Sequence, residues 1–370
     1  MKKLIAVSVV LALVVGSAFA EWTWNARVDI GAVLAQGDDD DDSEITGQLR
    51  SPLVRFWTTG SRETNVGTFG GMVLLDRNAL NAGEVRAFGE AWWRPIDMLW
   101  LGLGNDLGRL DNIARGGDGF HRDLAGVGGG WIPNFAPSLG GDEGFIGVDR
   151  AFYRGMSTGF IADVNVMDMV DFGIGLPYGT TANEVADIMQ GINARVRVNL
   201  DGIGRIGFAY AGSAADDNNG TIFASFHSGD LVPGLALNFG VGFYLLEDAE
   251  ELAIGFGVGW GAAEQFGVGF RGSVGIGIGD YAAWDLRMAF QAVPRFNVTP
   301  DVSVLLPVGF ALNMHDDADD PLIGWRVNPY IRVNLGWPAF AFGFDIWGSS
   351  WGSDNSALNW AVPIGMRVQF

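Results

Sequence analysis

The chain has 370 residues, of which 48% are hydrophobic, and it carries a formal charge of −20 with no cysteine. The acidic balance argues against a nucleic-acid partner, since phosphate contacts require a positive surface. The lack of cysteine excludes disulfides and thiolate metal sites. The 14 Trp and 25 Phe residues exceed the aromatic content typical of a disordered acidic chain.

Residues 1–20 have the features of a secretory signal peptide. Lys2 and Lys3 form a positive start, residues 4–15 are apolar, and Ala18-Phe19-Ala20 fits a small-x-small cleavage site. The apolar run is shorter than the ~20 residues that a spanning helix needs. We therefore expect cleavage after Ala20 and one mature domain over residues 21–370. The 23 basic residues lose two lysines with the signal, which leaves 21 arginines against 43 acidic residues, a formal charge of −22 (21 − 43).

The mature chain consists of segments in which apolar and polar residues alternate. This period of two predicts β-strands with one apolar and one polar face. Facing is ambiguous only in the second and third segments, where Leu53, Val54, Phe56 and Trp57 do not alternate. Residues 182–190 resemble a short helix within a loop. The expected strands cover residues 22–34, 47–58, 64–76, 83–94, 97–106, 150–163, 168–178, 192–200, 205–212, 221–228, 234–246, 252–261, 266–278, 282–293, 302–314, 325–335, 339–347 and 357–370.

The predicted fold class is all-β, a transmembrane antiparallel up-and-down β-barrel of about eighteen strands, with sixteen as the alternative. Short connections alternate with longer, acidic ones, which is typical of outer-membrane barrels. No apolar stretch after residue 20 has the length of a spanning helix, so a membrane crossing requires a closed barrel. A soluble propeller or sandwich is the rival. Aromatic residues near strand ends and a polar face of Gly, Asn, Ser and Arg favour a lipid-facing wall around a wet lumen.

Two motifs carry a resemblance to known proteins. Gly365-Met366-Arg367-Val368-Gln369-Phe370 resembles the terminal β-signal of outer-membrane proteins, in which Gly365, Val368 and Phe370 are the defining positions. Residues 91–104 resemble a hairpin of porins, and the chain is similar to uncharacterised spirochaetal outer-membrane porins. The resemblance implies a location in the cell outer membrane. It also implies contacts with its lipid and its assembly machinery, and a possible homotrimer.

The longest connection, residues 107–149, is the candidate constriction. It is the third long connection, and in general porins the third long loop folds into the lumen. An external loop is the alternative, and loops of this length are usually functional or disordered. Its candidate constriction residues are Arg109, Asp111, Arg115, Asp118, Arg122, Asp123, Asp142 and Glu143.

The predicted lumen face of the strands carries charged residues and, over residues 240–277, mainly glycine. The glycines either leave room for an inserted segment or permit curvature of the wall. Charged rings determine ion preference in pores, although Arg–carboxylate pairs that brace the wall are the alternative role. The pore-lining candidates are Arg86, Glu90, Arg195, Arg197, Arg271, Arg287, Arg326 and Arg332.

No enzyme, cofactor or metal motif is apparent. The three histidines, His121, His227 and His315, lie far apart in the sequence. The aspartate runs 38–42 and 316–320 offer oxygen ligands for calcium, but neither has EF-hand spacing, and solvated loops explain them better. We therefore expect no catalytic residue, no cofactor and no metal.

The expected function is a porin-like channel for passive diffusion of small hydrophilic solutes or ions. A transporter of hydrophobic substrates, of the fatty-acid type, is one alternative. Such a protein has an N-terminal plug, whereas here a strand is expected from Trp22. A surface adhesin or structural barrel is the other alternative.

Overall fold

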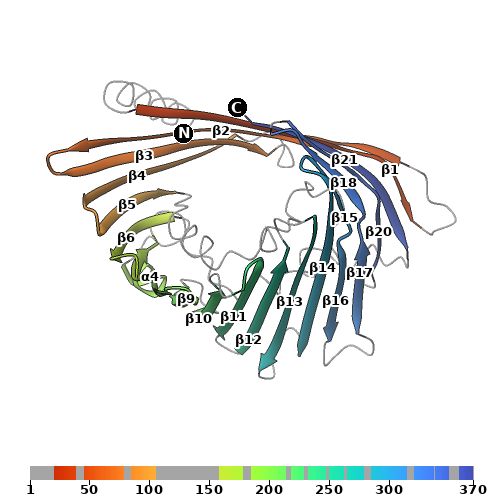
Figure 1. The fold of residues 1–370 in the computed structure, drawn as a ribbon. Coiled ribbons are helices and arrows are strands. Elements are labelled where there is room, and N and C mark those ends of the chain that lie inside the picture. Colours follow the sequence, from red (N-terminus) through yellow and green to blue (C-terminus); the bar gives the residue numbers. More distant parts are fainter. Residues whose placement is uncertain are drawn as a thin grey trace.

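In the computed structural model, one antiparallel sheet closes on itself (Figure 1). The structure describes residues 21–38, 46–78, 85–105, 158–177, 185–213, 218–228, 232–246, 250–261, 265–278, 285–314, 321–336, 338–349 and 358–369. The strand segments are β1 (Glu21–Asp38), β2 (Thr46–Thr64), β3 (Gly67–Asn78), β4 (Val85–Ile96), β5 (Leu99–Asn105), β6 (Thr158–Val166), β7 (Val170–Leu176), β8 (Asn193–Leu200), β9 (Gly204–Ala211), β10 (Asn218–Ser228), β11 (Leu235–Leu246), β12 (Glu250–Trp260), β13 (Phe266–Ile278), β14 (Leu286–Thr299), β15 (Val302–Leu305), β16 (Val308–Met314), β17 (Leu322–Val327), β18 (Tyr330–Asn334), β19 (Ala339–Gly343), β20 (Asp345–Ser349) and β21 (Asn359–Gln369).

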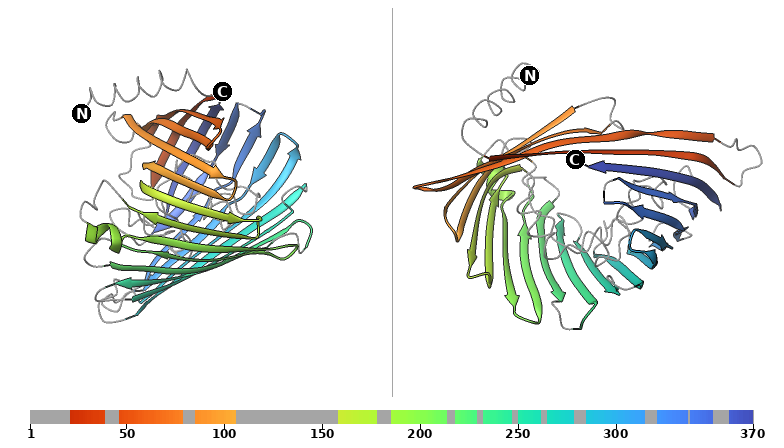
Figure 2. Two further views of the ribbon diagram at one scale, coloured as in Figure 1. Left: turned by 90° about the vertical axis from the view of Figure 1, so that its left-hand side faces the viewer. Right: turned by 45° about the horizontal axis from the view of Figure 1, so that its top comes forward.

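These segments make an eighteen-stranded barrel, which confirms the predicted fold class and strand number. Three barrel strands consist of two segments each: β15 with β16, β17 with β18, and β19 with β20. In each case the two halves share the same neighbouring strands. β21 pairs with β1 and closes the barrel. Figure 2 shows the strands inclined around the lumen, as closure of a barrel requires.

Prolines explain the three interruptions, where the sequence predicted unbroken strands. Pro307 and Pro329 separate the halves of two strands, and Pro363 of β21 lies opposite the break at Phe344. Proline has no N–H to donate to the ladder. The proline carbonyls still accept: Asn328 N donates to Pro307 O at 2.8 Å, and Phe344 N donates to Pro329 O at 2.9 Å. The neighbouring strands therefore stay hydrogen-bonded beside each break.

The two faces of the barrel differ as the period of two predicts. On the outer face, Phe208 is 58% exposed and Phe239 47% exposed, because lipid is their natural solvent. Along β12, buried inward residues alternate with more exposed outward residues. Direct cross-strand partners share a face, so the register assigns inward and outward positions to neighbouring strands.

An aromatic row crosses the outer face from β10 to β17. Each member lies directly opposite the next, and Phe256 and Phe290 close over Gly272, where an added Cβ would lie 2.5 Å from Phe256 Cζ. Cross-strand aromatic pairs stabilise a sheet by roughly 0.2–1 kcal/mol each. The row consists of Phe226, Phe239, Phe256, Gly272, Phe290, Phe310 and Trp325.

The seam between β1 and β21 contains an irregularity. The register of β1 shifts between Val33 and Gln36 against both of its neighbours, β2 and β21. Inside the barrel, Val33 packs against Trp347 and Ala361. Near Gly37 the indole of Trp360 fills the space where a Cβ would be, with Trp360 Nε1 3.1 Å from that position. Tryptophans of the last two barrel strands thus pack beside the bulge of the first.

The short helix α4 (Val185–Gln190) lies between β7 and β8 and has no buried residue, in agreement with a helical loop segment. None of the described helices is long and apolar enough to cross a membrane. The connection at residues 106–157 and the predicted signal peptide at residues 1–20 lie outside the described residues.

Candidate functional site

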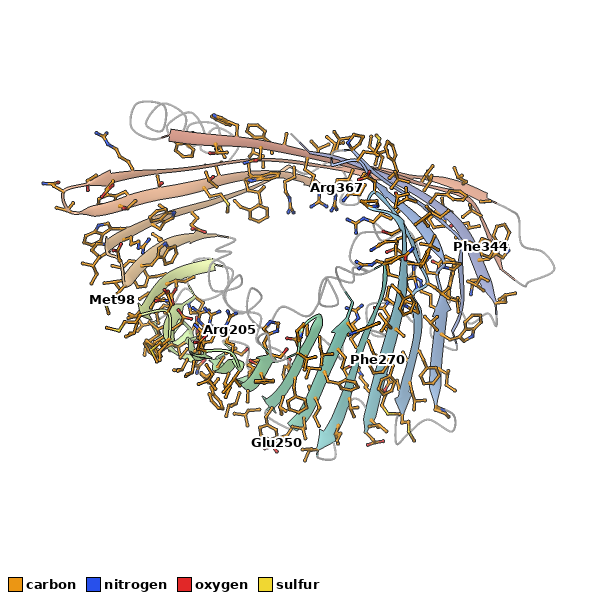
Figure 3. The ribbon with its side chains drawn as sticks, in the orientation of Figure 1. Met98, Arg205, Glu250, Phe270, Phe344 and Arg367 are labelled. Atoms are coloured by element: carbon orange, nitrogen blue, oxygen red, sulfur yellow. The ribbon has the colours of Figure 1, made fainter. Side chains whose placement is uncertain are left out.

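The lumen wall is the candidate functional site, because it gathers the charged side chains of the strands. Figure 3 shows Arg205 and Arg367 pointing inward from opposite sides of the barrel, whereas Phe270 and Phe344 point outward. The register extends the inward assignment from these two arginines to their neighbours. The arginines on this face are Arg27, Arg55, Arg195, Arg197, Arg205, Arg271, Arg287, Arg295, Arg326, Arg332 and Arg367. Among the side chains that the structure describes, the carboxylates on it are Glu90, Asp163, Asp171, Glu251 and Asp345.

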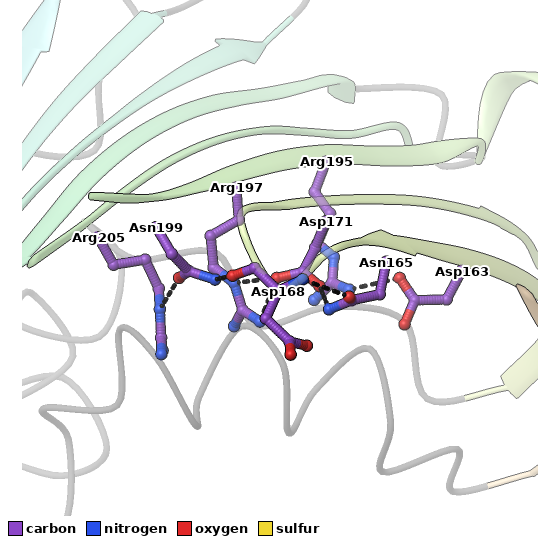
Figure 4. A network of polar contacts seen from close by, with 8 residues as sticks. All are labelled: Asp163, Asn165, Asp168, Asp171, Arg195, Arg197, Asn199 and Arg205. Atoms are coloured by element: carbon purple, nitrogen blue, oxygen red, sulfur yellow. Dashed lines mark hydrogen bonds and ion pairs between the residues drawn. The ribbon is translucent and has the colours of Figure 1, made fainter. Parts of the chain in front are cut away.

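On one wall, β6 to β9 hold an arginine–carboxylate ladder (Figure 4). Arg195 Nη2 donates to Asp163 Oδ1 at 2.9 Å, and both side chains are almost fully buried. Arg197 Nε donates to Asp171 Oδ2 at 2.7 Å. Asn165 also donates to Asp171. These contacts support the bracing role for Arg195 and Arg197, because the pairs join β6, β7 and β8 across the wall.

The ladder continues toward the short connections through uncharged partners. Arg205 Nε donates to Asn199 Oδ1 at 2.7 Å, and Asn199 Nδ2 donates to Asp168 O at 2.5 Å. Met167 and Asp168 have positive φ angles of 52° and 57° in the β6–β7 turn, a conformation that costs energy for residues other than glycine. The amide of Asp168 is held by Asn165 Oδ1 at 3.0 Å, which stabilises this turn.

A second braced pair joins two of the interrupted strands. Arg326 of β17 donates from Nε to Asp345 Oδ1 and from Nη2 to Asp345 Oδ2, both at 2.8 Å. Asp345 is fully buried, whereas Arg326 keeps 26% of its side chain exposed. Such a two-pronged contact fixes the geometry of both side chains. Arg326 is therefore a bracing residue with one face still available to the lumen.

Five arginines form a group on the opposite wall, which we call the basic arc: Arg27, Arg55, Arg295, Arg332 and Arg367. Arg27 lies directly opposite Arg55. The two alanines beside Arg332 and Arg367 on β19 are small and buried. Like-charged neighbours at such spacing repel each other, but the backbone register also places acidic residues opposite two arginines of the arc: Asp29 lies opposite Arg367 and Asp76 opposite Arg55. Among the side chains that the structure describes, this wall is predominantly basic.

The arc lies at nearly one depth in the barrel. From Arg367 to Arg332, and again from Arg332 to Arg295, the path crosses two strands and shifts by two residues toward the long connections. Two strands span about 9.6 Å and two residues about 6.6 Å, which gives an angle of about 35°. That angle matches the usual tilt of barrel strands. The guanidinium groups therefore follow the circumference of the lumen and not its long axis.

The remaining predicted residues are placed as follows. Arg271 and Arg287 lie on the lumen face of β13 and β14, and Glu90 on that of β4. The backbone of Arg86 lies in β4, but its side chain is outside the described part. Gly365 lies inward and Val368 outward on β21, and Phe370 is outside the described residues. All eight constriction candidates fall within residues 107–149 and are likewise outside them.

Sequence reasoning missed five lumen residues: Arg55, Asp171, Arg205, Glu251 and Arg295. Arg295 lies beyond the strand expected over residues 282–293 and follows Pro294, but β14 continues to Thr299. Arg287, Gln291 and Arg295 are spaced by four residues, which keeps them on one face of a strand. That spacing would have indicated that Arg295 faces the lumen. Arg55 was hidden by the apolar residues on both of its sides. Among the described residues, no three His, Asp or Glu side chains are grouped as metal ligands.

Comparisons with known proteins identify the fold. No family model matches the sequence, and no curated protein matches it. Solved structures do match over 95% of the chain. OpdQ of Pseudomonas aeruginosa has a TM-score of 0.56 at 10% identity with 97% of its own chain covered. OccAB3 of Acinetobacter baumannii has 0.56 at 8% identity with 100% covered. The trimer form of OmpT, an outer membrane protein of Vibrio cholerae, has 0.54 at 9% identity with 100% covered. The chain thus has the fold of outer-membrane porin barrels, and its lipid-facing outer wall agrees with that location.

Proposed function

We propose that the protein is an outer-membrane channel for passive diffusion of small hydrophilic solutes, with a preference for anions. The observation that carries this proposal is the basic arc within a closed barrel. Arginines outnumber carboxylates on the described lumen face, and three of the five carboxylates are engaged in ion pairs with Arg195, Arg197 and Arg326. The remaining positive field favours anions at close range.

The fold of the structural neighbours supports a channel over the other candidates. A fatty-acid-type transporter would need an apolar path through the lumen, whereas this wall presents arginines, asparagines and glycines. An enzyme would need a reactive constellation, and the ion pairs of this wall have the geometry of braces. A closer kinship with spirochaetal porins, cleavage after Ala20, and an inward fold of residues 107–149 remain predictions from the sequence.

The partners follow from the same proposal. The outer face would contact outer-membrane lipid, and the terminal motif with Gly365, Val368 and Phe370 would be recognised by the assembly machinery. One structural neighbour was solved in a trimer form, and a homotrimer is proposed here by that analogy alone.

Single-channel recording in planar bilayers tests the function. The refolded mature chain should give stable open steps, and the reversal potential in a salt gradient should show anion preference. Replacing Arg367 with Gln should reduce that preference without closing the channel, because one charge of the arc is lost. A folded, heat-modifiable protein that gives no current, or that selects cations, would contradict the proposal.

A further inference from the structure

Apolar side chains protrude from the short connections, which together form one rim of the barrel. The short connections cover residues 65–66, 97–98, 167–169, 201–203, 229–234, 261–265, 300–301 and 335–338. Six of these eight contain an apolar side chain that is at least 44% exposed, and the other two have one within two residues. The protruding residues, which we call the apolar rim, are Val66, Met98, Met167, Met169, Ile203, Val232, Phe266, Val298 and Leu335.

The apolar rim extends around the barrel and is not confined to one side. Each short connection joins two strands that are neighbours in the closed sheet. Strands lie about 4.8 Å apart, so successive short connections are spaced by roughly 10 Å. A protein partner would bind one side of such a rim, whereas a bilayer surrounds every part of it. The distribution of these residues therefore favours lipid as their partner.

Met167 is the most exposed member of the apolar rim, and its backbone gives a second reason to expect a partner. It has a φ of 52° and is 83% exposed. The left-handed region favours Gly, Asn or Asp, and water favours a polar side chain. Neither condition favours methionine, whereas contact with an apolar environment stabilises it.

Backbone hydrogen bonds hold the methionines of two neighbouring connections in place. Asn165 N donates to Met98 O at 2.8 Å, and Asn199 N donates to Met169 O at 2.7 Å. Figure 3 shows Met98 on the outer side of the wall. Met98 therefore extends the lipid-facing surface of the wall onto the rim.

An aromatic pair marks the level of the membrane boundary at the first short connection. Trp93 stacks on Phe69 with ring centroids 5.7 Å apart, and Phe69 is 43% exposed. Trp93 Nε1 donates to Val66 O at 2.9 Å. Tryptophan prefers the membrane–water boundary, where its ring has apolar surroundings and its N–H has a partner. The hydrogen bond to Val66 indicates that this boundary lies beside the connection itself.

We propose that the apolar rim is inserted among phospholipid headgroups, so that the short connections lie within the interfacial layer of the membrane and do not project into water. The charge pattern agrees with this placement. Each short connection has at most one acidic residue, whereas residues 38–42 of a long connection are all aspartate, and bringing charges near lipid costs free energy. The proposal extends lipid contact from the outer wall to the turns, and it does not depend on whether the barrel conducts.

Nitroxide labels test this placement, since the chain has no cysteine and an introduced cysteine is labelled alone. The refolded mature chain is placed in vesicles of phosphatidylethanolamine and phosphatidylglycerol. Oxygen concentrates in the bilayer and a nickel chelate stays in water, so electron paramagnetic resonance with each relaxing agent reports depth. Oxygen should be the more effective agent in each of four single variants: Met98→Cys, Met167→Cys, Val232→Cys and Leu335→Cys.

Two further positions calibrate the measurement. Phe270→Cys marks the lipid-facing wall, because Phe270 points outward. Glu250→Cys marks the opposite rim, where Glu250 is an exposed carboxylate at the start of β12. Rim labels should resemble Phe270→Cys, and rim labels as accessible to the chelate as Glu250→Cys would overturn the proposal. Protection confined to neighbouring connections would also overturn it, because it would indicate a protein partner on one side.

A polar variant of one stretch of the rim tests whether the apolar side chains cause the insertion. The variant combines Met98→Ser, Met169→Ser, Ile203→Ser and Met167→Asn. Asparagine is compatible with the positive φ at position 167, and heat modifiability verifies that the barrel is folded. A nitroxide at Asp97→Cys should become severalfold more accessible to the chelate in this variant, while one at Leu335→Cys should stay unchanged. Unchanged accessibility at Asp97→Cys in the folded variant would overturn the role of the apolar side chains.

Discussion

The buried pair between Arg326 and Asp345 makes an asymmetric prediction about stability. Asp345 is fully buried and Arg326 is 26% exposed, so the two single truncations are not equivalent. Arg326→Ala leaves a buried carboxylate without its partner, and breaking a buried pair in this way costs about 3–5 kcal/mol. Asp345→Ala leaves an arginine that can turn toward water, so the cost should be about 1–3 kcal/mol.

Urea unfolding of the barrel in lipid vesicles, followed by tryptophan fluorescence, measures both values. The double variant should be less destabilised than Arg326→Ala alone, because it no longer buries an uncompensated charge. The exposed pair Arg94–Asp97, at 3.4 Å with side chains 46% and 100% exposed, is the control, and Asp97→Ala should produce no measurable change. Equal costs for Arg326→Ala and Asp345→Ala would refute the argument from burial.

Three further predictions address packing, assembly and the β6–β9 wall. Gly104→Ala should destabilise the barrel by about 1–3 kcal/mol in the same unfolding assay, because an added Cβ would lie 2.2 Å from Gly89 O. Gly89→Ala should be tolerated, since its nearest contact would be Met72 O at 3.9 Å, and a reversed order would refute the steric reason. Deletion of Phe370 should lower the heat-modifiable fraction in outer membranes while leaving the conductance of inserted molecules unchanged, and altered conductance with normal insertion would contradict an assembly role. Asp163→Asn should destabilise the barrel by about 3–5 kcal/mol, because it leaves the buried Arg195 without its counter-charge, and an unchanged unfolding midpoint would show that the pair contributes no net stability.

Most of the fold could be predicted because one physical pattern repeats along the chain. In a membrane barrel every strand has one face toward lipid, so the period of two persists from β1 to β21 and identifies the strands. The predicted strand boundaries were less accurate where a proline interrupts an otherwise regular alternation of apolar and polar residues. Residues 302–314 alternate well, yet Pro307 lacks the N–H that the ladder needs, and the structure divides this strand.

The candidate site was predictable only in part. Residues separated by an even number of positions lie on the same face of a strand. This rule placed Arg326 and Arg332 together on the lumen side of one strand. The rule cannot distinguish their roles, because Arg326 meets Asp345 from another barrel strand, while the cross-strand neighbours of Arg332 are Ser303 and Ala341. The choice between a brace and a binding residue depends on which side chains the register brings together. Sequence spacing alone does not specify that register, even between the paired strands that carry Arg326 and Asp345.

The bulge of β1 has a consequence for how the barrel is completed. Neighbouring strands elsewhere are consecutive in the chain, so a connection limits how far each can slide along the next. The pair β1–β21 joins opposite ends of the chain and has no such connection. A slip of two residues would preserve the alternation of faces, so pattern alone does not exclude it. It would, however, move Trp360 away from Gly37 and Val33 away from Trp347. The bulge at Val33–Gln36 and the tryptophan contacts beside it therefore favour one register between the first and last strands.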